Sequence, residues 1–80
     1  MRLPRDLSGK DLIERLGRLD YRPTRQTGSH VRLTTERGGQ HHVTIPLHDP
    51  LRAGTLAAIL KAVAIHHGLS REELLERLQP

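Results

Sequence analysis

The sequence predicts an α+β fold, in which a helix, a three-stranded antiparallel sheet and a second helix are followed by a short C-terminal helix. Two observations support this order. Apolar residues recur at helical spacing before residue 20 and after residue 54, whereas the chain between them alternates apolar and polar residues in short runs separated by glycine turns. The 80 residues are enough for a single domain over 1–80, with a small core and the helices packed on one face of the sheet.

The first helix is expected in "SGKDLIERLGRLD", residues 8–20, after a short N-terminal arm that ends at Leu7. Ser8 can cap the free backbone N–H groups, and Asp11 follows at the third helical position, where an acid favours the helix dipole. Leu7 can pack on Leu12 as a hydrophobic staple. The expected buried face comprises Leu12, Ile13, Leu16 and Leu19.

Three strands are expected between Tyr21 and Pro46, joined by turns at "TGS" and "ERGG". Pro23 should place the first strand at an edge, because proline lacks the N–H group that a central strand needs. Side chains alternate between the two faces of a strand. One face should therefore carry Val31, Leu33, Val43 and Ile45, and the opposite face His30, Arg32, Thr34, His42 and Thr44. The second face would stay open to a partner.

Two helices should follow the sheet. The segment "TLAAILKAVAIHH", residues 55–67, has an apolar stripe at helical spacing, with Thr55 as its expected cap and Gly68 as its stop. A capping box of Ser70 and Glu73 starts the last helix, and Leu74 extends its apolar side.

Composition restricts the class of protein. The chain has no cysteine, which excludes disulfides and thiolate metal sites and fits a reducing cytoplasm, where we expect the protein to act. It has one Tyr and neither Phe nor Trp, so an interface that stacks bases on rows of aromatic rings is hard to make from it. No apolar run approaches the roughly 20 residues that span a bilayer, and the first twelve residues lack the apolar stretch of a signal peptide. We expect no membrane partner.

Positive charge is concentrated in the predicted strands. The formal net charge is +4, yet the first helix is neutral and the last mildly acidic. Between Tyr21 and His48, four arginines face a single acid, Glu36, and four of the six histidines lie in the same span. This distribution favours RNA or DNA as a partner. The alternative is that exposed strands carry arginine for solubility and to protect their edges.

The histidine pairs His41–His42 and His66–His67 do not favour a metal site. Adjacent strand residues point to opposite faces, and adjacent helix residues diverge by about 100°. We therefore expect neither a metal nor another cofactor.

Three blocks of the sequence, in this order, resemble one family. The blocks are "RQTGSH", "IPLH" and "GTLAAIL", and the similarity runs from about Ser8 to Ile65. The chain resembles the HicA toxins of bacterial and archaeal toxin–antitoxin systems. This resemblance implies a fold like the double-stranded RNA-binding domain, metal-independent cleavage of messenger RNA, and neutralisation by a HicB-type antitoxin that covers the active site. It also implies that His30 is catalytic, whereas the helix after Ser70 lies beyond the similarity.

The residues suggest how such a site would work. RNA carries its own nucleophile, the 2′-OH, so cleavage needs a general base, a general acid and positive charge for the phosphate. His30 can serve as acid or base, with His48 or His42 as the partner. The groups expected to bind RNA are Arg25, Arg32, Ser29 and the backbone around Gly28. Two alternatives remain, namely a non-catalytic RNA-binding module and a subunit whose basic face docks an acidic protein.

Overall fold

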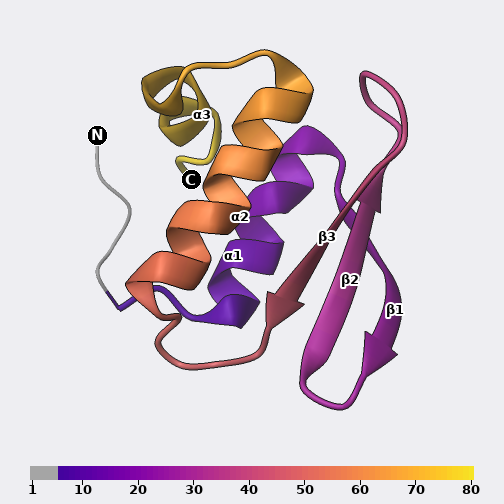
Figure 1. Ribbon diagram of the computed structural model, residues 1–80, viewed down its shortest axis with the longest axis vertical. Helices are drawn as coiled ribbons and strands as arrows, with labels where there is room; N and C mark the ends of the chain where they lie inside the picture. Colours follow the sequence, from indigo (N-terminus) through magenta and orange to yellow (C-terminus); the bar gives the residue numbers. More distant parts are fainter. Residues whose placement is uncertain (1–5) are drawn as a thin grey trace.

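The computed structural model describes residues 6–80 and confirms the α+β fold. Residues 1–5, which hold most of the expected N-terminal arm, lie outside the described residues. In chain order the elements are α1 (Gly9–Leu16), a 3₁₀ turn η1 (Gly17–Leu19), β1 (Arg22–Thr27), β2 (His30–Thr35), β3 (His41–Pro46), α2 (Ala53–His67) and α3 (Arg71–Arg77). All the helices lie to one side of the sheet, and the other side carries none of the described chain (Figure 1). Within residues 6–80, no helix has the length and apolar character needed to cross a membrane.

The sheet is antiparallel, with β2 between β1 and β3. Pro23 lies in the edge strand β1, as expected, and the register shifts between Pro23 and Arg25 in a β-bulge. The β1–β2 turn has two central residues, Gly28 and Ser29, flanked by the pair Thr27 and His30. Gly28 has φ 58°, which favours glycine and fits the first central position of a type II′ turn.

The predicted alternation is confirmed in both strands. Val31 and Leu33 of β2 are buried, as are Val43 and Ile45 of β3, whereas His30 and His42 are exposed. Leucines from the three helices and Tyr21 complete one hydrophobic core beneath the sheet. The histidine- and arginine-bearing face is therefore the one left uncovered, and we call it the open face.

The helix boundaries follow the predicted caps in two of three cases. Ser8 and Asp11 form a capping box at α1, and Ser70 and Glu73 form another at α3. The prediction that Thr55 caps the second long helix is wrong, because α2 begins at Ala53 and its N-cap is Arg52, without a side-chain hydrogen bond. The loop before α2 is held instead by Leu51, which is buried and donates its N–H to the Leu7 carbonyl at 2.9 Å.

The start of α1 packs closely against the end of β3. The Gly9 N–H donates to the His48 carbonyl at 2.9 Å, and a Cβ on Gly9 would meet the Pro46 carbonyl oxygen. This contact fixes the segment after β3, which carries His48, to the first turn of α1.

Candidate nucleic-acid interface

His30 is the first residue of β2 and is exposed on the open face. It pairs with Thr27 of β1 and with Pro46 of β3 in the sheet register. The turn that presents it is anchored, because the Ser29 carbonyl accepts a hydrogen bond from the Leu47 N–H at 2.7 Å. The imidazole is therefore held by a short turn at the end of a central strand and faces solvent.

Arg25 and Arg32 lie next to His30 on the same face. They are register partners, and Arg32 is two residues beyond His30 on β2, which corresponds to about 6.6 Å along the strand. The Nε atom of Arg32 is shielded from solvent and has no hydrogen-bond partner among residues 6–80. Guanidinium groups such as these bind phosphate through paired N–H donors.

The two candidate partner histidines lie at opposite ends of the sheet. His42 pairs with Thr34, four residues along β2 from His30, which is about 13 Å at the usual rise per residue. His48 follows β3 at the end where His30 sits, because Leu47 is bonded to Ser29. His48 also lines a hollow of about 520 Å³ between α1 and β1, on the helix side of the sheet edge. The structure therefore brings His48, and not His42, to the end of the sheet that carries His30.

His42 belongs to a hydrogen-bonded row that crosses the open face. Its Nδ1 lies 2.7 Å from the Thr34 hydroxyl oxygen, which lies 2.8 Å from the hydroxyl oxygen of Thr24. Thr24 in turn donates to the Arg32 carbonyl at 3.3 Å. Each of the three strands thus contributes one side chain, and we call Thr24, Thr34 and His42 the His42 row.

A cluster of rings on the other side of the sheet was not anticipated from the sequence. The Tyr21 hydroxyl lies 2.8 Å from Nδ1 of His41 and 3.1 Å from Nε2 of His67. His66 stacks on His41 with ring centroids 4.4 Å apart and donates from Nε2 to the Arg37 and Gly39 carbonyls. We call Tyr21, His41, His66 and His67 the imidazole cluster. The sequence shows the adjacent pairs His41–His42 and His66–His67. It does not show that the two pairs meet, which results from the packing of α2 on β3.

Burial changes the acidity of this cluster. It raises the pKa of Tyr21 to about 12. It also lowers the pKa of His41 and of His67 below the usual value, and the neighbouring His66 lowers both further. The neutral forms of Tyr21, His41 and His67 are therefore favoured. No group of three or more His, Asp or Glu side chains in the described part of the chain is arranged to hold a metal ion.

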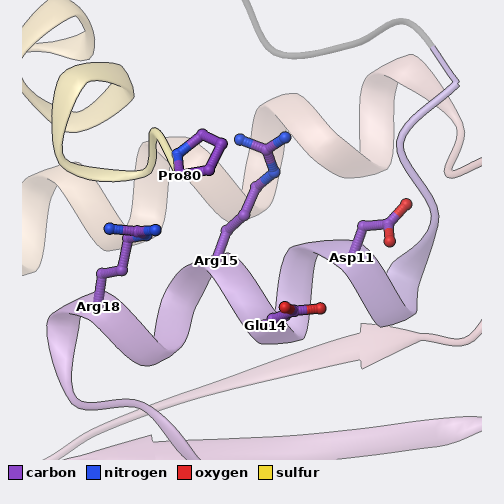
Figure 2. Close-up of a pocket in the computed structure, with 5 residues that line it drawn as sticks. All are labelled: Asp11, Glu14, Arg15, Arg18 and Pro80. Carbon is purple, nitrogen blue, oxygen red and sulfur yellow. The ribbon is translucent and has the colours of Figure 1, made fainter.

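A further pocket, of about 170 Å³, lies on the outer side of α1 (Figure 2). Its lining includes Arg15 of α1, Arg18 of η1 and Pro80, and the two arginine side chains point toward the C-terminal segment. Arg15 donates to the Leu78 carbonyl at 3.0 Å, so it ties the end of α3 to α1. This pocket lies between the first helical segment and the C-terminal Pro80, and no residue of the open face lines it.

One family model matches residues 9–65, and its description reads "HicA toxin of bacterial toxin-antitoxin". The match runs from the start of α1 through all three strands to near the end of α2, and it leaves α3 outside. No curated protein and no solved structure matches the chain.

Proposed function

Because the chain belongs to the HicA toxin family of bacterial toxin–antitoxin systems, we propose that it is the toxin of a type II system and an endoribonuclease that cleaves messenger RNA without a metal. The observation that carries this proposal is the placement of His30. It is exposed on the open face, at a glycine turn, beside two arginines. Cleavage of an RNA phosphodiester needs an acid–base group, which the imidazole of His30 can supply, and positive charge for the phosphate, which the two arginines can supply.

In the proposed reaction the 2′-OH of one ribose attacks the adjacent phosphorus. A base removes the 2′-OH proton, the bond from phosphorus to the 5′ oxygen breaks, and an acid protonates that oxygen. The products are a 2′,3′-cyclic phosphate and a free 5′-OH. His30 acts as general acid or base, a role typically worth about 10² to 10⁴ in rate.

Arg25 and Arg32 bind the phosphate in this proposal. Their register pairing puts both side chains on the face of His30, where guanidinium N–H groups can donate to phosphate oxygens. The hydroxyl of Ser29 and the backbone at Gly28 lie in the turn beside His30, where they can donate further hydrogen bonds.

His48 is the better supported partner for His30. Both histidines lie at the end of the sheet that the Ser29–Leu47 hydrogen bond closes. His42, about 13 Å away along the strand, is too distant to act on the same phosphate.

An antitoxin of the HicB type is the proposed protein partner, and it would cover His30. The uncovered, basic open face is a surface that an acidic partner can occupy, and such a partner would exclude RNA from it. A toxin gene with a gene for a HicB-like protein directly beside it is the arrangement that this proposal predicts.

RNA cleavage by the purified protein tests the function. Wild-type protein in EDTA should cut messenger RNA and leave 2′,3′-cyclic phosphate ends, whereas His30→Ala should stay folded and cut at least about 100-fold more slowly. Thr27→Ala is the matched control, because Thr27 pairs with His30 on the same face and should be dispensable.

Other outcomes favour the alternatives. RNA binding without cleavage would identify a non-catalytic RNA-binding module. Weak RNA binding that does not respond to salt would indicate a subunit that docks an acidic protein. A folded, fully active His30→Ala protein would refute the assigned role of His30.

A further inference from the structure

The open face is organised in three rows that cross the strands. The first contains Thr27 and His30, the second Arg25, Arg32 and Thr44, and the third is the His42 row. Successive rows are two residues apart on β2, or about 6.6 Å. This interval suits successive nucleotides of an extended RNA strand, so a strand cut at His30 and held by the arginines would reach the His42 row next.

The hydrogen bonds of the His42 row fix which atoms donate. The Arg32 carbonyl can only accept, so the Thr24 hydroxyl gives it its proton. Thr24 must then accept from the Thr34 hydroxyl, and Thr34 must accept from Nδ1–H of His42. In the neutral imidazole this assignment leaves Nε2 as a bare acceptor, on a side chain that is exposed on the open face.

A hollow adjoins the row. It has a volume of about 650 Å³, and Thr24 and Thr34 form part of its lining. Arg22 and Gln40 bring hydrogen-bond donors to it, and the Glu36 carboxylate brings an acceptor. Donors and acceptors on one shallow surface suit the edge of a nucleobase better than a phosphate, which only accepts.

We propose that the His42 row and this hollow form a base-recognition subsite of the ribonuclease, for a nucleotide about two positions from the scissile phosphate. The inference rests on the proposed function. The subsite selects a base with an exocyclic amino group, namely adenine, cytosine or guanine, whose N–H donates to Nε2 of His42. Uracil is disfavoured, because it has no amino group and its ring donor, N3–H, lies between two carbonyl oxygens that repel the Nε2 lone pair.

The test is cleavage of RNA oligonucleotides that carry each of the four bases at every position near the cut. Wild-type protein should disfavour uracil roughly fivefold at one position, about two nucleotides from the cut, as expected for one hydrogen bond. His42→Ala should lower cleavage of the amino-bearing substrates and raise that of the uracil substrate, which no longer faces the Nε2 lone pair, so the preference should disappear.

Two further variants test whether the base preference depends on the hydrogen bonds of the His42 row. Thr34→Val keeps the side-chain shape but removes the acceptor of Nδ1–H, so it should weaken the same preference. Thr44→Ala is the matched control, because Thr44 lies on the same strand and face but pairs with Arg32 outside the row. It should keep the wild-type preference.

Several results would overturn the subsite and leave the proposed function intact. These are a wild-type enzyme without base preference at that position, an unchanged preference in folded His42→Ala and Thr34→Val, or loss of all cleavage in folded His42→Ala, which would make His42 catalytic. A wild-type protein that cuts no RNA would instead refute the proposed function, and the subsite with it.

Discussion

Glycines at two positions show how single residues place the candidate site. Gly28 supplies the left-handed backbone that turns β1 into β2 and presents His30. Gly9 acts differently, because its missing side chain lets α1 approach the Pro46 carbonyl and hold the segment with His48. The two residues thus position the two histidines from opposite sides of the sheet's end.

Gly9→Ala should destabilise the fold. The added methyl group meets backbone, which moves less readily than a flexible side chain, so we expect a loss of about 1–3 kcal/mol in the free energy of unfolding. Gly54→Ala is the matched control, because Gly54 lies in the first turn of α2 with open space around it. That variant should gain up to about 1 kcal/mol from better helix propensity. Urea denaturation measures both, and equal stabilities would contradict the role of the Gly9 contact.

Some residues could be predicted from the sequence because their interactions are local. Ser8 and Ser70 each bond a backbone N–H three residues away, so the capping pattern is visible in a short window. The role of Gly9 could not be predicted, because its contacts are with Pro46 and His48, far along the chain.

At the scale of elements, α3 depends on its neighbours. It has 7 residues, too few for a stable helix alone, and lies outside the family match. It is held by its buried leucines and by the hydrogen bond from Arg15 of α1 to the Leu78 carbonyl.

Arg15→Ala should therefore loosen α3. Removing a charged donor from a partly buried carbonyl should cost about 1 kcal/mol of unfolding free energy. Amide hydrogen exchange should show faster exchange in residues 71–77. Arg18→Ala, from the same pocket, is the matched control and should leave exchange in α3 unchanged. Equal protection in both variants would show that the leucines alone hold α3.

The strands were predictable at this scale, whereas the start of α2 was not. A period of two residues puts Val31 and Leu33 on one face whatever the tertiary structure. The start of α2 depends instead on Leu51, which is buried and bonded to Leu7, and no local capping signal marks it. Thr55 was a misleading signal because a threonine can also sit inside a first turn.

At the scale of the whole molecule, the open face was visible in the sequence and the imidazole cluster was not. His30 and Arg32 share a face through strand periodicity alone. The cluster joins β3 to the last turn of α2, and it needs the packing that brings His67 to Tyr21. We therefore expect the stability of the whole fold to depend on pH.

The direction of that dependence follows from the pKa shifts. Burial, reinforced by His66, lowers the pKa of His41 and His67, and Arg37 and Arg77 add to the effect at His67. His42 adds to it at His41. The end of α2 favours a charged imidazole through its dipole, but the net shift at His67 is downward. The unfolded chain thus binds more protons below about pH 6.5 than the folded chain does.

The contribution of His41 and His67 to the free energy of unfolding should be fully present above about pH 6.5. It should be lost as the pH falls through the lowered pKa values of the folded state. Chemical denaturation between pH 7.5 and pH 5 should show this loss in the wild type. His67→Gln keeps a group that can bond the Tyr21 hydroxyl but removes one titrating ring, so its stability should fall less over the same range. His30→Gln is the matched control, because His30 lies outside the cluster on the open face, and it should keep the wild-type slope. Parallel slopes for wild type and His67→Gln would show that the cluster does not set the acid sensitivity of the fold.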